Sequence, residues 1–362
     1  MRTLITILDG ITQTSMPFNE FVLYRASHMK HEKQVLICLC GRRDLSEFNI
    51  PDSLDIRFAG RKLSRIRKVI KQAVKEAEDR GDHYAVHLHQ VQSGFLAQIA
   101  MIGTGMRKKT LFTVHSTFSG YQFHNKFLSF TNALFANRIT CVSNTSYNDY
   151  PKIIRNIKKD RITALQNGVD TERIDAVLEG VQRENDCDTV DFIYVARLIP
   201  LKNHFFLTKV LAKVKGNVRF IFVGAEDKDY DVRKKAEEEG VRDRILFTGL
   251  LPRDEVYRRL YNADVYISSS TLEGLPISVL EAMYCGLPCI LSDIMQHRET
   301  AGDEAAILGN DADAWAENID RLASLTAEQR QMLGRKAKEY VKENFSLQAM
   351  HEKYDSIYEK LY

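Results

Sequence analysis

Short apolar runs rich in β-branched and aromatic residues recur along the chain, with stretches of helical periodicity between them. Continuous apolar runs of this length are typical of strands buried on both faces of a parallel sheet. The predicted strands are 3–8, 34–40, 84–89, 110–115, 138–143 and 162–166 in the first half, and 191–196, 219–224, 244–249, 264–269, 288–293 and 305–309 in the second. Two such series predict an α/β chain with two doubly wound, Rossmann-like domains.

A polar, acid-rich stretch separates the two series. Residues 171–190 begin with a helical pattern and end in ENDCD before the next predicted strand. Such a segment is linker-like, because it lacks the apolar positions that a packed element needs. We therefore predict an N-terminal domain over 1–170 and a second domain over 171–345.

The last forty residues are helical in pattern. Thr326 and Gln329 have the spacing of a capping box. In the final segment, 346–362, an apolar stripe at i, i+3, i+4 and i+7 marks a helix face that must be buried against another element. The stripe consists of Tyr354, Ile357, Tyr358 and Leu361.

Composition limits the class of protein. The 362 residues are 44% hydrophobic and 27% charged, as in a soluble globular protein. We find no apolar run of about 20 residues, the length that a membrane-spanning helix needs. The first residues read as a strand rather than a signal peptide, so a cytoplasmic protein is expected. The six cysteines form no C-x-x-C pair and have no partners at zinc-ligand spacing, so we interpret them as reduced and mostly buried.

Charge is distributed unevenly along the chain. Residues 1–180 hold 26 basic and 17 acidic residues, whereas the remainder holds 25 and 31. The basic helical pattern at 61–77 and the cluster Arg107, Lys108 and Lys109 could rest on an anionic membrane surface. The alternative is a solvated helix whose apolar stripe belongs to the core. Nucleic acid is not expected as a partner, because the basic residues lack interleaved aromatic residues.

The segment 271–293, TLEGLPISVLEAMYCGLPCILSD, joins the end of a predicted strand to a helix. Leu275 and Pro276 are predicted to begin that helix, because the missing N–H of proline is not needed in a first turn. Helix N-termini bind phosphate, and ligands of open α/β sheets lie at the carboxyl ends of strands. The segment is therefore a candidate site for a nucleotide diphosphate.

Charged residues surround this helix start. Glu273 lies in the loop and can face the group beyond the phosphates, while Glu281, predicted about two turns into the helix, can accept hydrogen bonds from ribose hydroxyls. Arg197 and Lys202, in the loop after strand 191–196, can clamp a diphosphate. Taken singly, each pair could also be solvent-exposed charge.

These motifs, in this order, resemble the retaining glycosyltransferases of family 4. The resemblance is strong over the second half and weaker over the first. It implies the GT-B fold, in which two Rossmann-like domains face a central cleft and the final helix crosses back to the first domain. The matching features are R-x4-K at 197–202, E-x7-E at 273–281, NGVD at 167–170, the stretch 245–270, GLPCILSD at 286–293, and the chain's ending.

The resemblance implies roles for individual residues. Glu273 would contact the donor hexose, Arg197 and Lys202 would stabilise the departing diphosphate, and His115 would face the sugar from across the cleft. The donor-binding positions would be Gly274, Leu275, Glu281, Gly249, Leu250 and Leu251, with the last three holding the base. For His115, the alternative is a purely structural role at the end of its strand. For His87 and His89, a structural role is the interpretation that we favour.

The loop after the first strand departs from the family pattern. A Gly-Gly pair often lies there, where the backbone approaches the phosphate and the acceptor. Here Ser15 and Met16 occupy that place, although Gly10 remains. Side chains at these positions would narrow the approach.

The resemblance also implies the chemistry. It suggests transfer with retention, for which a double displacement would need a carboxylate nucleophile near the anomeric carbon. The first domain offers no obvious one, so we favour front-face attack, in which a leaving phosphate oxygen helps to deprotonate the acceptor. No metal or other cofactor is expected. The Asp-x-Asp pairs at 186–188, 227–229 and 311–313 are interpreted as chance surface pairs.

The sequence thus favours a glycosyltransferase that moves a hexose from a nucleotide-diphosphate sugar to a glycan or lipid-linked glycan acceptor. A UDP-sugar is expected from family frequency, and SDIMQHRE at 292–299 resembles a variant of exopolysaccharide and capsule enzymes. Such an enzyme would act in the cytoplasm or on the inner face of the plasma membrane. The alternatives are a sugar-nucleotide epimerase or phosphorylase on a similar scaffold, and a non-catalytic partner of another transferase.

Overall fold

The computed structural model describes residues 1–11, 16–40, 45, 50–183 and 189–362. Contacts divide the chain into two compact units. Unit 1 comprises Met1–Asn167 together with Leu347–Tyr362, and unit 2 comprises Gly168–Ser346. Near the points where the chain passes from one unit to the other, its two segments pair: the N–H of Val169 donates to the carbonyl of Phe345 at 2.7 Å.

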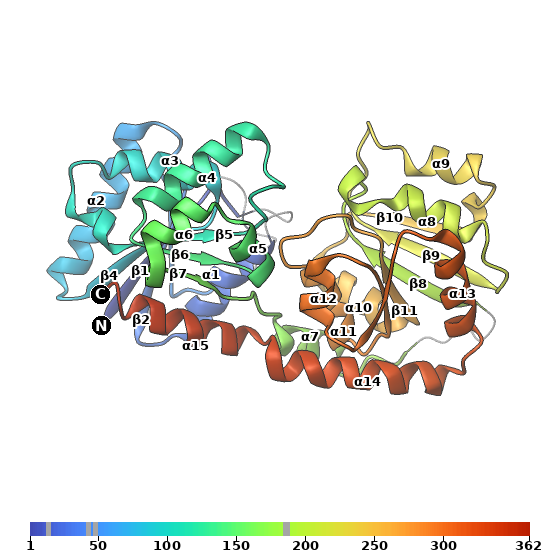
Figure 1. The fold of residues 1–362 in the computed structure, drawn as a ribbon. Coiled ribbons are helices and arrows are strands. Elements are labelled where there is room, and N and C mark those ends of the chain that lie inside the picture. Colours follow the sequence, from blue (N-terminus) through green and yellow to red (C-terminus); the bar gives the residue numbers. More distant parts are fainter. Residues whose placement is uncertain (12–15, 41–44, 46–49, 184–188) are drawn as a thin grey trace. The chain divides into compact units, whose positions relative to one another are not determined.

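Unit 1 is built on a parallel sheet (Figure 1), as predicted. Its strand order is β3-β2-β1-β4-β5-β6-β7. The strands are β1 Arg2–Leu8, β2 Glu32–Cys38, β3 Leu54–Phe58, β4 His83–Leu88, β5 Thr110–Val114, β6 Arg138–Cys141 and β7 Ile162–Ala164. Strand β3 escaped the sequence analysis. As an edge strand it buries only Leu54 fully, so its sequence LDIRF lacks the continuous apolar run of its neighbours.

Helices cover both faces of this sheet. One core contains side chains of α2, α3, α4 and α6, and the other contains side chains of α1 and of α15, which returns from the end of the chain. The helices are α1 Met16–His28, α2 Leu63–Asp79, α3 Val91–Ala100, α4 Phe123–Phe135, α5 Asn144–Asp149, α6 Lys152–Lys158 and α15 Leu347–Tyr358, with short 3-10 turns at Gly105–Lys109 and Lys159–Arg161.

The structure shows where the apolar stripe of the basic helix α2 lies. Its apolar residues Ile66, Ile70 and Ala73 are buried in the core of unit 1. The apolar stripe therefore belongs to the core, as the alternative interpretation expected. Contact of the charged side of α2 with an anionic membrane stays a prediction.

Unit 2 contains a second parallel sheet, of order β10-β9-β8-β11-β12-β13. Its strands are β8 Val190–Val195, β9 Val218–Val223, β10 Ile245–Gly249, β11 Val265–Ser268, β12 Cys289–Ser292 and β13 Ala305–Leu308. Its helices are α7 Thr171–Leu178, α8 His204–Leu211, α9 Val232–Glu238, α10 Arg253–Asn262, α11 Ile277–Tyr284, α12 Met295–Ala301, α13 Ala312–Ala323 and α14 Ala327–Asn344, with 3-10 turns η4 Pro200–Lys202 and η5 Arg242–Arg244.

The C-terminal predictions are confirmed. Thr326 and Gln329 form both hydrogen bonds of a capping box at the start of α14. The stripe from Tyr354 to Leu361 is buried in the core that α15 shares with α1. The helical pattern is interrupted at Phe345 and Ser346, where α14 of unit 2 gives way to α15 of unit 1.

The described cysteines are free thiols; Cys40 is half-buried and the others are buried. Cys187 lies outside the described residues. Among the helices that the structure describes, none has both the length and the apolar character needed to cross a bilayer.

Candidate functional site

The structure brings the predicted donor residues to one edge of the unit 2 sheet. Arg197 and Lys202 follow β8, Gly249 ends β10, and Glu273 lies between β11 and α11. Strands β10, β9, β8 and β11 are consecutive in a parallel sheet, so their carboxyl ends meet. This edge is where open α/β sheets bind ligands.

Lys202 and Glu273 contact each other directly. The Nζ of Lys202 lies 2.5 Å from Oε1 of Glu273, and the hydroxyl of Ser270 donates to the same oxygen at 2.6 Å. Both charged side chains are largely buried, with exposures of 20% and 11%. A shielded ion pair is stronger than one in water, so it ties the η4 turn to the loop that follows β11.

Polar residues that the sequence analysis did not name form hydrogen bonds with the segments that carry this ion pair. The buried hydroxyl of Tyr194 donates to the carbonyl of Lys202 at 3.1 Å and lies 2.7 Å from the Ser270 hydroxyl. Ser269 donates to the Lys202 carbonyl as well, at 3.0 Å. The signal in the sequence was the serine run SSS directly before TLEG.

His297 extends the same network under the site. Its Nδ1 lies 2.9 Å from the carbonyl of Ser292, which fixes the proton on that nitrogen, and its Nε2 lies 3.4 Å from the hydroxyl of Ser268. Burial lowers the pKa of His297, so the ring is neutral at pH 7. The histidine of SDIMQHRE is therefore packed beneath the loop that carries Glu273.

Glu281 is buried and forms an ion pair with Arg253, a residue the sequence analysis did not name. Arg253 begins α10, directly after the loop Leu250–Pro252, and its guanidinium also lies over the ring of Tyr257. A carboxylate buried to 1% exposure needs such a partner to stay charged. The pair joins the predicted ribose position to the predicted base-binding loop.

The predicted start of the helix is wrong by two residues. α11 begins at Ile277, and Pro276 is its N-cap, with φ −79° and ψ 83°. Gly274 and Leu275 therefore belong to the loop, and Glu281 lies little more than one turn into the helix. The difference arises because the ψ of Pro276 is not helical, although its φ suits a helix.

Glycines shape the loops around Arg197. Gly249 has φ 71°, and its carbonyl accepts a hydrogen bond from the N–H of Gly224. A Cβ on Gly224, whose φ is 155°, would overlap the carbonyl of Ala196, next to Arg197. Gly224 was not predicted as a site residue, yet only glycine allows this approach. Arg197 and Leu250 are exposed, and Leu251 is half-buried.

In unit 1, His115 follows β5 at the carboxyl edge of its sheet. Its Nε2 lies 3.1 Å from Nδ1 of His89, and the ring of Phe18 packs edge-on against it at 4.5 Å between centroids. Burial lowers the pKa of His115 to about 3. At neutral pH its imidazole is uncharged and can exchange hydrogen bonds with a hydroxyl group.

His87 and His89 are buried within unit 1. Nδ1 of His87 lies 2.6 Å from the hydroxyl of Tyr358, and its Nε2 lies 2.7 Å from the hydroxyl of Thr113. The rings of the two histidines are 3.7 Å apart. These contacts give His87 a structural partner on α15 and connect it, through His89, to His115.

The loop after β1 holds the other predicted positions. Gly10 is packed against Cys40 so closely that a Cβ would overlap the sulfur. Ser15 lies outside the described residues, and Met16 begins α1 without a described side chain. The neighbouring Asp9, which the sequence analysis passed over, lies 3.7 Å from Arg61, and burial raises the pKa of its carboxyl group.

The described Asp-x-Asp pairs have structural partners. Asp227 accepts a hydrogen bond from the N–H of Asp229, and Asp311 caps α13 through the N–H of Asp313. Asp186 and Asp188 lie outside the described residues. Within the described part of the chain, no three His, Cys, Asp or Glu residues are grouped as metal ligands.

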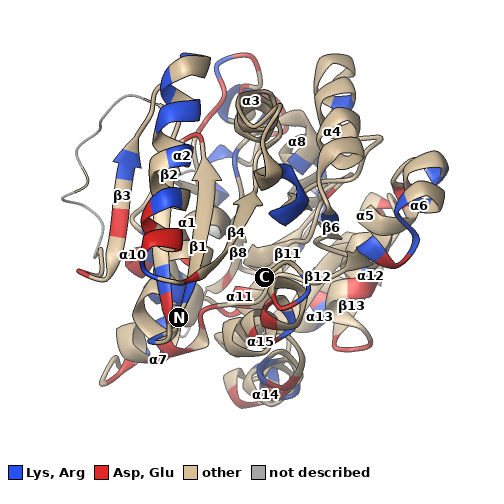
Figure 2. Ribbon diagram, turned by 90° about the vertical axis from the view of Figure 1, so that its left-hand side faces the viewer, with Lys and Arg blue, Asp and Glu red and all other residues tan. Residues whose placement is uncertain are grey.

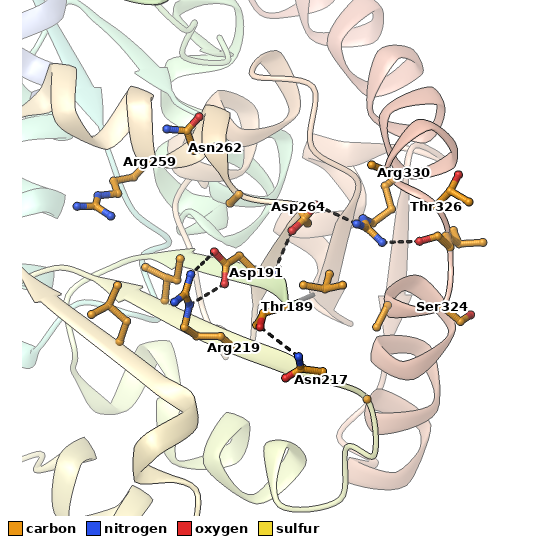
Figure 3. Close-up of a pocket in the computed structure, with 18 of the residues that line it drawn as sticks. Thr189, Asp191, Asn217, Arg219, Arg259, Asn262, Asp264, Ser324, Thr326 and Arg330 are labelled. Atoms are coloured by element: carbon orange, nitrogen blue, oxygen red, sulfur yellow. Dashed lines mark hydrogen bonds and ion pairs between the residues drawn. The ribbon is translucent and has the colours of Figure 1, made fainter. Parts of the chain in front are cut away.

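A cavity of about 1090 Å³ lies in unit 2, at the opposite edge of the sheet (Figure 3). The amino ends of β8 and β9 line it, together with the junction of α13 and α14. Arg219 makes two hydrogen bonds with Asp191, and Arg330 pairs with Asp264 at 3.0 Å. Each of these arginines is thus neutralised by an aspartate. The cavity therefore differs from the candidate site both in its position on the sheet and in its chemistry.

The chain matches two family models, one in each half. Residues 22–173 match Glycosyltransferase Family 4, and residues 181–340 match Glycosyl transferases group 1. This protein is a family 4 glycosyltransferase. The second match covers β8 through α11, which carry the unit 2 residues of the predicted site, and the first covers His115, whereas Gly10, Ser15 and Met16 precede it.

Relatives and solved structures agree with this assignment. The glycosyltransferase is 27% identical over 343 residues to the Bacillus subtilis protein named glycosyltransferase EpsF, covering 90% of this chain and 83% of that one. It is 28% identical over 232 residues to the Escherichia coli UDP-Gal:alpha-D-GlcNAc-diphosphoundecaprenol alpha-1,3-galactosyltransferase, covering 58% and 57%. The Anabaena HepE structure with UDP and glucose matches with a TM-score of 0.78 at 14% identity, over 99% of this chain and 100% of that one. That likeness confirms the GT-B fold.

Proposed function

We propose that this glycosyltransferase moves a hexose from a UDP-sugar to a glycan or lipid-linked glycan acceptor, with retention, in the synthesis of a surface polysaccharide. The observation that carries the proposal is the gathering of Lys202, Glu273 and Glu281 at the carboxyl edge of the unit 2 sheet. The printed names of the relatives support a UDP-linked donor and a lipid diphosphate acceptor, since the Escherichia coli enzyme is named for both.

Each residue then has a distinct task. Lys202 and Arg197 would neutralise the diphosphate as it leaves, and Glu273 would orient the sugar hydroxyls. Glu281 would hold the ribose, with Arg253 keeping its carboxylate charged and oriented. His115, being neutral, would exchange a hydrogen bond with a sugar hydroxyl.

Retention is proposed through front-face attack. As the C1–O bond to the diphosphate breaks, the electron pair stays on the phosphate oxygen, and the acceptor hydroxyl adds to C1 on the same face. The acceptor proton passes to that phosphate oxygen. The chain's own contribution is positioning and charge, because Lys202 offsets negative charge as it grows on the leaving group.

A titration of thermal stability tests the donor site. UDP, GDP, ADP, CDP and dTDP are added without metal to wild type and to Glu281→Ala. A nucleotide at 100 times its Kd stabilises a folded protein by about 2.7 kcal/mol. We expect UDP to shift the wild type and hardly to shift the variant, because Glu281 holds the ribose.

A matched control separates binding from damage. Asp264→Asn also breaks an ion pair of unit 2, but at the opposite edge of the sheet. It should lower the starting melting temperature and retain the full UDP shift. A wild type that no nucleotide shifts would contradict the donor site, and turnover of a UDP-sugar without any acceptor would favour the epimerase alternative.

A further inference from the structure

Helix α4 of unit 1 buries polar side chains and exposes two phenylalanines, although Phe130 packs partly against the core. Its buried residues are Ser129, Asn132 and Ala133, whereas Phe123 and Phe127 are 89% and 62% exposed. An ordinary surface helix buries its large apolar residues and exposes its polar ones. Two buried polar side chains of α4 make hydrogen bonds: Ser129 lies 2.9 Å from the hydroxyl of Tyr150, and Nδ2 of Asn132 donates to the carbonyl of Val91, while its Oδ1 has no partner among the described residues. The helix is therefore anchored in this orientation.

Helix α6 lies beside α4 and also exposes apolar residues. Ile154 is buried in the same core as Ala133, while Ile153 and Ile157 are each 58% exposed. The ammonium group of Lys158 donates to the carbonyl of Leu134, which joins the C-terminal ends of the two helices. We call the exposed apolar side chains of these helices the α4–α6 face; they are Phe123, Phe127, Leu134, Phe135, Ile153 and Ile157.

The charge on and around this face is mainly positive. Residues 83–148 contain no Asp or Glu, and neither does α6. Figure 2 shows α4 without acidic residues and basic positions on α6. The Lys and Arg residues of 83–148 and of α6 are Arg107, Lys108, Lys109, Lys126, Arg138, Lys152, Arg155 and Lys158. The guanidinium carbon of Arg107 lies 4.1 Å from the ring centre of Phe135. The nearest acidic residues in sequence, Asp149 and Asp160, flank α6; Asp149 accepts a hydrogen bond from the N–H of Ser119.

We propose that the α4–α6 face docks on an anionic lipid bilayer. Protruding aromatic and aliphatic side chains would enter the boundary of the acyl chains, while the surrounding Lys and Arg would contact lipid phosphates. Each feature alone has an ordinary explanation, but exposed aromatic and aliphatic side chains on two neighbouring helices, within a mainly basic surround, point to one partner. The proposal rests on the proposed function in one respect: a lipid-linked acceptor requires the enzyme to work at a bilayer.

The α4–α6 face differs from the basic helix α2, which the sequence suggested as a membrane-binding surface. The apolar residues of α2 are in the core, so α2 offers only charge. A surface that only attracts phosphate loses its binding in salt, whereas one that also inserts apolar groups retains part of it. The two surfaces therefore predict different behaviour.

The test measures co-sedimentation with phosphatidylcholine vesicles, with and without phosphatidylglycerol, at low and at raised salt. The double variant Phe127→Ser/Ile157→Ser should lower the partition coefficient at least about tenfold, since each buried side chain of this size contributes at least a factor of that order. Met295→Ser/Met332→Ser is the matched control, because these exposed residues of unit 2 are 64% and 58% accessible. It should bind as wild type does.

A spectroscopic variant locates the contact. The chain has one tryptophan, Trp315, which is fully buried in unit 2. In Phe127→Trp the added fluorescence should shift to the blue on anionic vesicles and remain unchanged on pure phosphatidylcholine. No binding by wild type, or equal binding by the Phe127→Ser/Ile157→Ser variant, overturns the proposal.

The other possible occupant of the α4–α6 face is a protein, and the experiment must distinguish it from a lipid bilayer. If light scattering shows a wild-type oligomer that Phe127→Ser/Ile157→Ser converts to a monomer, the face is a contact between copies of the chain and the proposal falls. Binding to vesicles needs neither donor nor acceptor, so its failure is distinguishable from failure of the UDP shift. Because both substitutions lie in unit 1, folding of the double variant is checked by circular dichroism and by its urea unfolding transition, which should resemble those of wild type.

Discussion

At Gly224, backbone conformation and site geometry depend on each other. The residue adopts φ 155°, and its α-carbon faces the carbonyl of Ala196 so closely that a methyl group cannot fit. Arg197 is the next residue along that loop. The position of a catalytic candidate is therefore set by a glycine 27 residues away in sequence, in the neighbouring strand-end loop.

We predict that Gly224→Ala displaces the Arg197 loop and lowers kcat. A shift of about 1 Å at a charged group in an active site can reduce the rate about 100-fold. The UDP shift should largely persist, since Glu281 and Arg253 lie on other elements. Gly309→Ala is the control, because a Cβ there meets only open space. Equal kcat in the two variants would refute this role for Gly224.

His204 lies in the core of unit 2, stacked on Tyr194 with ring centroids 4.7 Å apart. Burial, with a smaller contribution from Lys202, lowers the pKa of His204 from 6.5 to about 3. Above pH 6.5 the ring is neutral whether the chain is folded or not. As the pH falls below 6.5, the unfolded chain binds a proton that the native chain does not, and stability is lost down to about pH 3.

Replacing this ring therefore tests acid stability. At pH 4.5, His204 should cost about 2–3 kcal/mol of the free energy of unfolding. We predict that His204→Phe, which retains the stacking on Tyr194, makes the melting temperature less dependent on pH between 6.5 and 4. The measurement is calorimetry of both proteins over that range. Parallel pH profiles for the two would mean that His204 is not the group responsible.

At the scale of elements, α15 completes unit 1. Tyr354 and Tyr358 are fully buried on the helix and reach the histidines and threonines of the sheet. Arg25 of α1 is buried to 1% exposure and pairs with Glu32 and with Asp355 of α15. A buried arginine needs such partners, so α1, β2 and α15 depend on one another.

The two tyrosines give a matched pair of tests. Tyr358→Phe removes the 2.6 Å partner of His87 and leaves a buried nitrogen unsatisfied, which costs about 1–3 kcal/mol. Tyr354→Phe removes only contacts of 3.3 and 3.5 Å to threonine hydroxyls, and should cost less. Urea unfolding compares the two variants, and the opposite order would contradict the assigned role of His87.

At the scale of the whole molecule, the two units differ in how many segments of the chain form them. Unit 2 is one uninterrupted segment, whereas unit 1 needs both ends of the chain. The core between α1 and the sheet contains Leu347, Met350 and the tyrosines of α15. Without α15, those apolar neighbours would be left open to water.

We predict that a fragment of residues 168–346 folds alone and shows the UDP shift. A fragment of residues 1–167 should remain unfolded by circular dichroism until residues 347–362 are attached to it, because only then is its second core closed. A folded and stable 1–167 fragment would show that α15 is dispensable, and a 168–346 fragment that fails to fold would show that unit 2 is not independent.

Most of the architecture is visible in the sequence. Apolar runs mark twelve strands that the structure contains, and the positions after them mark Arg197, Lys202 and Glu273. These features are local. A strand that is buried on both faces must be apolar along its length, and once the strand is located, the residues that follow its carboxyl end are located as well. The edge strand β3 was missed for the same reason, because its exposure removes the signal.

The sequence by itself determined the two parallel sheets, the family and the set of charged residues at the strand ends. Only the tertiary structure decided that Lys202 pairs with Glu273, that Arg253 pairs with Glu281, that the apolar stripe of α2 is buried and that Phe123 and Phe127 of α4 are exposed. The physical reason is the same in each case. Periodicity shows that a helix has an apolar side, and composition shows that charges are present, but which neighbour covers that side or neutralises that charge depends on residues brought together from distant parts of the chain.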